Sequence, residues 1–409
     1  MTGHNPAADN SNRAVSGTGS EKTTNTLTGS TTTSPWTPSL RTWSDELDDQ
    51  PRYRLDQLWQ GLYQQCLDPS QVTNLPKTLR SELAERYRPA LSMAAEQRSR
   101  DSATIKWLWQ TQDNSQVEAV LMHYARRSTV CISSQAGCAM DCGFCATGQA
   151  GFKRHLSVGE ILEQVVAAIR ECDRHDNNEG ALSDRASTRG NRRLSNIVFM
   201  GMGEPMANYD RVLEATRRLI HDFGIGARHI TISTVGLVPQ MLRFAEEGLQ
   251  VGLALSLHAA NDELRNELVP VNRRHPIDDL IAACQLFRER TGRRVSLEWA
   301  MIDGVNDRPS DASELAEVAH RAKAHVNLIP LNPTPGWPTV GSPSERIAEF
   351  AQRLRSSGVN VTVRQNRGTD IDAACGQLAG RHAGDGDQVG TESQAPVTEA
   401  PVELRAKPN

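Results

Sequence analysis

Residues 133–148 read SSQAGCAMDCGFCATG, and Cys138, Cys142 and Cys145 within them have the spacing C-x3-C-x2-C. Thiolates suit zinc and iron–sulfur clusters best. A structural zinc site needs four ligands, usually from two C-x2-C pairs, and the sequence contains no second pair. Three cysteines on a four-iron cluster leave one iron open, so the motif favours a cluster whose fourth ligand is a substrate or cofactor. Zinc, or cysteines with unrelated roles, is the alternative.

Around the cysteine motif, short β-rich runs alternate with helical patterns, which predicts parallel strands covered on both faces. Six such units predict an α/β fold, a partial (β/α)6 TIM-like barrel over residues 115–380. The motif follows the first strand, at the end where barrel enzymes place their active sites. The polar stretch 173–194 is expected to be a surface loop. The runs are 128–132, 196–200, 228–233, 251–257, 293–302 and 325–331, and the helical patterns are 157–172, 209–222, 238–247, 276–291, 310–323 and 343–357.

Both ends of the chain differ in composition from its middle. Residues 1–40 and 382–409 are polar, with too few large apolar side chains to offset the entropy of ordering them, so disordered tails are expected. A small helical domain is expected over residues 45–100. It is indicated by an apolar stripe at three- and four-residue steps, formed by Leu55, Leu58, Trp59, Leu62, Tyr63 and Cys66.

Charge and hydropathy narrow the class of protein only slightly. The formal net charge is −4, but residues 1–50 hold six acids and three bases and residues 381–409 hold five acids and three bases, which leaves about +1 for residues 51–380. That balance neither demands nor excludes RNA as a partner. The sequence shows no membrane-length apolar run and no signal-peptide pattern, so a cytoplasmic location without membrane association is expected. Clustered cysteines in that reducing compartment hold metal more often than they form disulfides.

A second motif, GMGEP at residues 201–205, directly follows the run that ends at residue 200. Glycines after a strand let the backbone approach a ligand closely, and a carboxylate can hold an ammonium group. A glycine-rich turn is weak evidence by itself. Its place after a strand, in order with the cysteine motif, makes it stronger.

The cysteine motif and GMGEP together resemble the radical S-adenosylmethionine (SAM) superfamily. A closer likeness, over about residues 45–380, is to the RlmN-type family of dual-specificity 23S rRNA and tRNA adenine-C2 methyltransferases. It is carried by VCISSQAGC (130–138), GFKRHLS (151–157), MGMGEPMAN (200–208), SLHAAND (256–262), VNLIPLNP (326–333) and RQNRGTDIDAACGQLAG (364–380).

This resemblance implies a set of cofactor-binding residues. Cys138, Cys142 and Cys145 would hold a [4Fe-4S] cluster whose open iron is chelated by the amino and carboxylate groups of SAM. Gly203 and Glu204 would contact the methionine part of SAM. The remaining positions implied for the SAM site are Ser233, for which the hydroxyl of Thr234 is the alternative, and Ser256, Leu257, His258 and Asn332.

The resemblance also implies a mechanism that consumes two SAM molecules per turnover. One methylates Cys375, and the other yields a radical that takes a hydrogen from the S-methyl group, after which the carbon radical adds to electron-poor adenine C2. Glu118 would accept the C2 proton, and Cys131 would attack the Cys375 sulfur and leave a disulfide. An exposed strand carboxylate is the plain alternative for Glu118, and a buried small side chain is that for the two cysteines.

The implied partners are 23S rRNA at the peptidyl-transferase centre, tRNA at the adenosine 3′ of the anticodon, and an electron donor such as flavodoxin or ferredoxin. A monomer is expected, with the helical segment 45–100 as an RNA-docking domain. Two other functions stay open at this point. One is the related C8-adenine rRNA methylation that confers antibiotic resistance, and the other is a non-catalytic metal-binding RNA protein.

Overall fold

The computed structural model describes residues 33–125, 127–180, 194–332, 334, 340–374 and 376–378. The expected tails therefore lie mostly outside the described residues. Residues 33–40 are an exception to the expected disorder, because Thr33 forms a β-bridge with Tyr87 and Trp36 is buried. A large aromatic side chain in a polar segment can bury enough apolar surface to order its neighbours.

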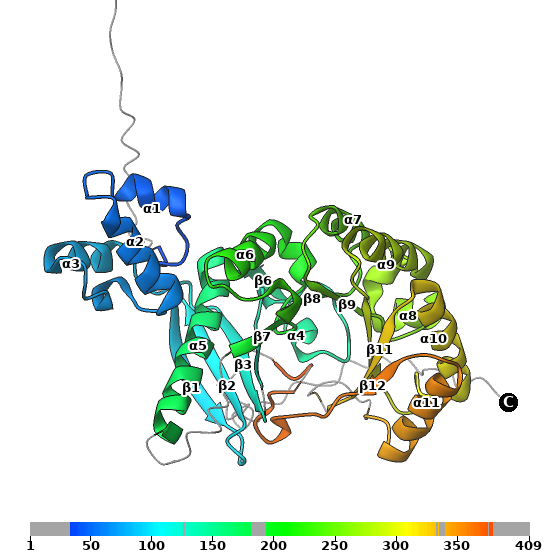
Figure 1. The fold of residues 1–409 in the computed structure, drawn as a ribbon. Coiled ribbons are helices and arrows are strands. Elements are labelled where there is room, and N and C mark those ends of the chain that lie inside the picture. Colours follow the sequence, from blue (N-terminus) through cyan, green and yellow to red (C-terminus); the bar gives the residue numbers. More distant parts are fainter. Residues whose placement is uncertain are drawn as a thin grey trace, which may run out of the picture.

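The N-terminal helices form a lobe beside the main sheet (Figure 1). They are α1 (Leu40–Glu46), α2 (Tyr53–Trp59) and α3 (Lys77–Arg86). The sequence predicted that the helical domain extends to residue 100. In the structure the helical part ends earlier, because β1 (Leu91–Arg98) pairs with β2 of the main sheet. Alternating exposure along β1 explains why its residues lack the apolar run of a central strand.

One large open sheet forms the core, with the order β1-β2-β3-β4-β7-β8-β9-β10-β11-β12. The pairs from β1 to β4 are antiparallel, and those from β4 to β12 are parallel. The expected α/β partial barrel is confirmed, with an antiparallel extension on one side. The strands of the whole sheet are β1, β2 (Thr104–Thr111), β3 (Gln116–Tyr124), β4 (Arg127–Cys131), β7 (Leu194–Phe199), β8 (Ile230–Thr234), β9 (Gly252–Ser256), β10 (Ser296–Met301), β11 (His325–Pro330) and β12 (Val361–Val363).

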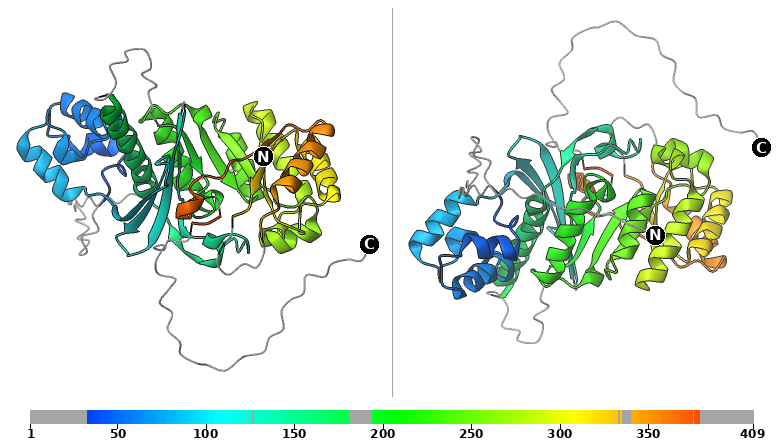
Figure 2. Two further views of the ribbon diagram at one scale, coloured as in Figure 1. Left: turned by 90° about the horizontal axis from the view of Figure 1, so that it is seen from below. Right: turned by 90° about the horizontal axis from the view of Figure 1, so that it is seen from above.

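Helices cover the outer side of this curved sheet (Figures 1 and 2). Helix α5 begins with a capping box, because the Ser157 hydroxyl accepts from Glu160 N at 3.3 Å and the Glu160 carboxylate accepts from Ser157 N at 2.8 Å. It continues to Gly180, so the first part of the expected loop 173–194 is helical, and residues 181–193 lie outside the described residues. The helices are α5 (Val158–Gly180), α6 (Tyr209–His221), α7 (Val238–Glu246), α8 (Asp262–Leu268), α9 (Ile277–Thr291), α10 (Pro309–Ala322) and α11 (Ser344–Ser356).

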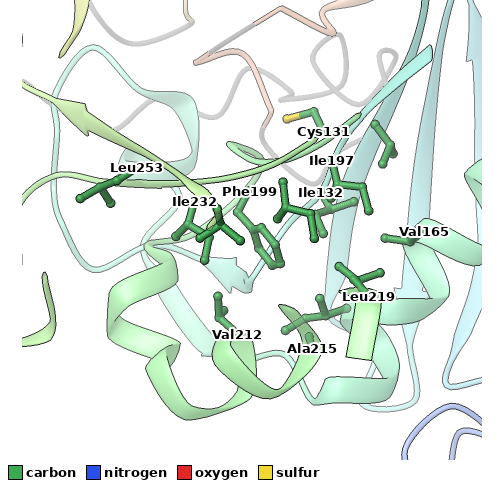
Figure 3. Packing of buried hydrophobic residues seen from close by; sticks show 14 of the residues in the cluster. Cys131, Ile132, Val165, Ile197, Phe199, Val212, Ala215, Leu219, Ile232 and Leu253 are labelled. Carbon is green, nitrogen blue, oxygen red and sulfur yellow. The ribbon is translucent and has the colours of Figure 1, made fainter. Parts of the chain in front are cut away.

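The hydrophobic core lies between one face of the sheet and the helices that cover it. Figure 3 shows side chains of α5 and α6 beneath those of the parallel strands, while Cys131 lies on the opposite side of the cluster. The sheet therefore has a helix-covered face and an inner face. The residues that pack between sheet and helices in this region include Ile132, Val165, Ile197, Phe199, Val212, Ala215, Leu219, Ile232 and Leu253.

Candidate active site

The cysteine motif lies in a loop closed by a two-stranded sheet of β5 (Gln135–Gly137) and β6 (Phe152–His155). Gly137 has φ +73°, and a Cβ there would meet the carbonyl oxygen of Gly151 at 1.8 Å, so a side chain would disrupt this closure. The backbone N–H of Cys138 donates to the same carbonyl at 3.0 Å. A short helix, α4 (Ala146–Gln149), directly follows Cys145. The loop is thus held at both ends, and its three thiols are brought back over the sheet.

All three motif cysteines line one cavity of about 980 Å³. Within the described part of the chain, no three His, Cys, Asp or Glu side chains converge on a position for a single metal ion. Separate thiols around one cavity fit a cluster in which each iron takes one cysteine, and they do not fit the closed ligand shell of a structural zinc ion. Burial raises the pKa of Cys138 to about 12 and raises the pKa of Cys142 well above its ordinary value. Ligation must therefore displace protons.

GMGEP forms a second wall of this cavity, to which Gly203 and Glu204 both contribute. Gly203 has φ +97°, and a Cβ there would lie 2.4 Å from the Cβ of Gln135. Glu204 is buried, and its carboxylate accepts from the backbone N–H groups of Met206 and Val235, each at 2.9 Å. Burial raises the pKa of Glu204 to about 7, against the lowering effect of these hydrogen bonds. A cation that enters the cavity would favour its ionised form.

The structure brings three of the other five implied SAM-site residues to the cavity, namely Ser233, Ser256 and His258. Of the two candidate hydroxyls, Ser233 lines the cavity, while that of Thr234 accepts from Gly236 N at 3.0 Å. His258 Nδ1 accepts from Ala300 N at 3.0 Å, which places the proton of the neutral ring on Nε2. Burial lowers the pKa of His258 to about 3, so the ring is neutral at physiological pH.

Leu257 and Asn332 lie close to the cavity but do not line it. The Leu257 side chain is fully buried in the core, and its backbone N–H donates to the Glu298 carbonyl at 3.0 Å. The Asn332 Oδ1 accepts from Asn366 Nδ2 at 2.8 Å, while its buried Nδ2 has no hydrogen-bond partner among the described residues. An amide donor left without a partner beside a cavity is suited to bind a polar ligand.

Cys131 lines a neighbouring cavity of about 580 Å³, together with Ala374 and Tyr124. Cys375 lies outside the described residues, but both of its neighbours are described. Gly376 lines the cysteine cavity, and its carbonyl accepts from Ala146 N at 2.9 Å. The two cavities share the lining residues Met200, Ile329 and Arg364. The described residues on either side of position 375 therefore lie at different cavities, Gly376 at the cysteine cavity and Ala374 at the cavity of Cys131.

Glu118 is buried on β3, which differs from the exposed carboxylate that was its plain sequence alternative. Lys106 Nζ on β2 lies 3.4 Å from Glu118 Oε1. Because desolvation makes a buried ion pair a weak source of stability, its position in the interior suggests a role other than stabilisation. The sequence reasoning missed Lys106, although a lysine inside the otherwise apolar strand TIKWLW was a visible sign.

Arg265 on α8 is a further residue that the sequence reasoning missed. Its side chain is fully buried and donates to the carbonyls of Leu257 at 2.9 Å, Ser256 at 3.1 Å and Val235 at 2.7 Å. Burial lowers the pKa of Arg265 to about 10, and the guanidinium stays charged near Cys142. Arg265 thus fixes the ends of β8 and β9 that line the cavity. Its setting in DELRNEL resembles an exposed helix and gave no sign of this role.

Glu298 and Arg364 complete the cavity wall on the side of β10. The Glu298 carboxylate accepts from Ser296 Oγ and Asn327 Nδ2, each at 2.9 Å, and Arg364 Nη1 lies 3.6 Å from its other oxygen. Both charged side chains line the cavity. The sequence reasoning missed both residues, although a glutamate inside the apolar run SLEWAM could have indicated a functional position.

Comparisons with known proteins agree with this geometry. The radical SAM superfamily model matches residues 183–318. The probable dual-specificity RNA methyltransferase RlmN of Salinispora tropica is 50% identical over 338 residues, covering 81% of this chain and 88% of that protein. Its namesake from Mycobacterium marinum is 51% identical over 340 residues, covering 80% and 89%. The crystal structure of a radical SAM methyltransferase from Sphaerobacter thermophilus superimposes with a TM-score of 0.79 at 46% identity, covering 85% of this chain and all of that one.

An open α/β barrel with three cysteines around a deep cavity, matched in this way, defines a radical SAM methyltransferase. The chain belongs to the RlmN family. Membership implies a [4Fe-4S] cluster and SAM as cofactors, and it replaces the alternative of a non-catalytic metal-binding protein. None of the helices in the described residues has the length and apolar character needed to span a bilayer.

Proposed function

We propose that the protein methylates C2 of adenosine in RNA, at the peptidyl-transferase centre of 23S rRNA and at the adenosine 3′ of the anticodon in tRNA. The names of its relatives, dual-specificity RNA methyltransferases, support RNA as the substrate. The observation that carries the proposal is the connection of two cavities. Cys131 and Ala374 line one, Gly376 lines the other, and Met200, Ile329 and Arg364 line both.

The chemistry of adenine C2 explains why such an enzyme needs both a radical and cysteines. Because C2 is electron-poor, it cannot displace the methyl group of SAM as a nucleophile. When bound, the cluster and SAM supply one methyl group and one hydrogen-abstracting radical per turnover, which accounts for two SAM molecules. The sulfur of Cys375 carries the methyl group to the base and remains joined to it until a second thiol intervenes.

Release of the product is assigned to Glu118 and Cys131. The Glu118 carboxylate accepts the C2 proton, and the Cys131 thiolate attacks the Cys375 sulfur. The bond between that sulfur and the transferred carbon breaks, the carbon keeps the electron pair and takes up a proton to complete the methyl group, and the disulfide that remains must be reduced before the next turnover. Support comes from the sheet register, in which Cys131 on β4 is opposite Val120 on β3, two residues from Glu118. Residues two apart on a strand share a face, so the acid and the thiol lie on the same inner face.

Replacement of Cys375 by alanine is the test of this assignment. The variant should retain its iron and still cleave SAM on reduction, but it should form no 2-methyladenosine by nucleoside mass spectrometry. Cys284, which is buried in α9, provides the control, since Cys284→Ala removes a thiol that lines neither cavity and should keep methylation. Continued methylation by Cys375→Ala would refute the role of this residue. Formation of 8-methyladenosine by the unmodified enzyme would replace C2 by C8.

The helical lobe is proposed to dock RNA, while the core from residue 115 to 380 carries the chemistry. Arg218 of α6 contacts the hydroxyl of Tyr63 in the lobe and donates to the carbonyls of Trp36 and Pro38 just before it, which supports a fixed docking surface. Deletion of residues 1–88 tests this. Deletion of residues 1–100 would also remove strand β1 of the main sheet. Unchanged RNA affinity in a truncated protein that retains its cluster would discard the docking role.

The remaining assignments follow from the proposed activity. Reduction of the cluster requires a low-potential electron donor such as flavodoxin or ferredoxin. We place the enzyme in the cytoplasm, where its RNA substrates are made, and expect it to act as a monomer. The sedimentation coefficient of the purified protein tests whether it is a monomer.

A further inference from the structure

Lys106 is a buried cation in the middle of an apolar strand. Its side chain is 6% exposed and that of Glu118 is 2% exposed, with Nζ and Oε1 separated by 3.4 Å. The same Nζ donates to the backbone carbonyl of Asp372 at 3.3 Å. Lysine is rarely buried unless it is paired, because desolvation of its charge is costly. Lys106 therefore joins the carboxylate on β3 to the segment that carries Cys375.

The sheet register places this pair on the reactive face. Lys106 on β2 is opposite Val120 on β3, and Val120 is opposite Cys131 on β4. Directly opposite residues share a face, so these three form a row across the sheet, with Glu118 diagonally next to Lys106. The row borders the chain near Asp372, whose carbonyl Lys106 binds.

We propose that Lys106 is a positioning residue for proton transfer from adenine C2. Its ammonium keeps the Glu118 carboxylate ionised and turned toward the segment before Cys375, where the base is bound. In the step, the C2–H bond breaks, its electron pair stays with the base, and the proton forms an O–H bond on Glu118. Lys106 keeps its own protons and touches no reacting atom. This inference rests on the proposed function, in which Glu118 accepts the C2 proton.

A purely structural lysine would act differently from a positioning one. If Lys106 only anchored the Asp372 carbonyl, a neutral donor of similar length would replace it. If its charge is needed, a neutral donor fails, because a buried carboxylate without its cation takes up a proton and is no longer a base. Lys106→Gln keeps a donor for Asp372 and removes the charge, so it separates the two roles.

The test follows the covalent protein–RNA adduct in a single turnover under anaerobic conditions. In Lys106→Gln, the adduct should form at the rate of the unmodified enzyme and decay about 100-fold more slowly, the scale of a lost general base. Lys106→Arg, which restores a cation, should recover most of the decay rate. Lys323→Gln, at an exposed helix end, is the matched control and should behave as the unmodified enzyme. Decay of the Lys106→Gln adduct at the unmodified rate would overturn the proposal.

A double-variant comparison shows whether Lys106 acts through Glu118. In a Glu118→Gln background, Lys106→Gln should slow adduct decay by less than about twofold more, because the shared function is already lost. The double variant buries no unpaired charge, so the comparison also serves if Lys106→Gln alone does not fold. A further large slowing would show an independent role and overturn the inference. If the unmodified enzyme forms neither adduct nor 2-methyladenosine, the proposed function itself fails.

Discussion

Gly203 shows how one missing side chain shapes the cofactor cavity. It has φ +97°, and a Cβ would lie 2.4 Å from the Cβ and 2.8 Å from the backbone nitrogen of Gln135. The Gln135 side chain in turn accepts from Glu204 N at 2.7 Å. A side chain at position 203 would therefore displace Gln135 and, through it, Glu204 of the cavity wall.

We predict that Gly203→Ala weakens SAM binding at least tenfold, as measured by equilibrium binding to the anaerobic, cluster-loaded protein. Gly224→Ala is the matched control, since Gly224 has φ +69° but open space around its Cβ position. The control should cost about 1 kcal/mol of stability from backbone strain and leave SAM affinity unchanged. Equal SAM affinity for both variants would show that the close contact with Gln135 is unimportant.

Glu163 on α5 predicts a pH dependence of stability. Its carboxylate accepts from Ala90 N and Leu91 N, each at 2.8 Å, and burial raises its pKa from 4.5 to about 7. Between these values the native state holds a proton that the unfolded state releases. Stability should therefore fall as pH rises from about 4.5 to about 7 and change little from this group above that.

Urea denaturation of the anaerobic protein at pH 5 and pH 8 measures this effect. Glu163→Gln should remove a pH-dependent difference on the order of 3 kcal/mol, because the amide does not titrate. Glu267→Gln, on the surface of α8, is the control and should retain the difference. An identical pH profile for Glu163→Gln and the unmodified protein would contradict the prediction.

At the scale of elements, α6 holds the N-terminal segment in place through Arg218. The guanidinium donates to the carbonyls of Trp36 at 2.7 Å, Thr37 at 2.9 Å and Pro38 at 2.8 Å, and it pairs with Asp222 at 3.0 Å. Arg218 also contacts the hydroxyl of Tyr63. Five acceptors for one buried side chain explain how the mostly polar residues 33–38 are held against α6.

We predict that Arg218→Ala lowers the free energy of unfolding by about 3 kcal/mol, because buried carbonyls and Asp222 lose their partner. Arg217→Ala is the control on the same helix, since its ion pair with Glu247 is partly exposed and should contribute less than about 1 kcal/mol. Urea denaturation compares the two variants. A similar small loss in both would show that Arg218 does not hold the segment.

The parallel strands were predictable because they are apolar runs separated by helical patterns. The strands β1 and β2 were not, since β1 alternates in exposure and β2 carries Lys106 among its apolar residues. Helix α5 was predicted to end near residue 172 because the polar residues that follow it resemble a loop. Residues 173–180, DRHDNNEG, include Asp, Asn and Gly, which have low helix propensity, so nothing in them predicted that the helix continues.

On the scale of the whole molecule, the convergence of the motif residues on one site was predictable from the sequence. The buried charged side chains that contact the walls of this site were not. Cys138, Glu204 and Ser233 reach one cavity, as the resemblance implied. Lys106 and Arg265 were missed because their roles depend on contacts between segments far apart in the chain. Register and burial decide which charge meets which partner, and a single sequence contains little of that information.

The central claim is that the transferred carbon passes through Cys375 and loses one hydrogen before it reaches the base. The most direct measurement uses SAM with a fully deuterated methyl group, unlabelled RNA and mass spectrometry of the nucleosides after a single turnover of the deuterium-methylated enzyme. The account predicts 2-methyladenosine whose new methyl group carries two deuterium atoms. A methyl group with all three deuterium atoms would mean direct transfer and would contradict it.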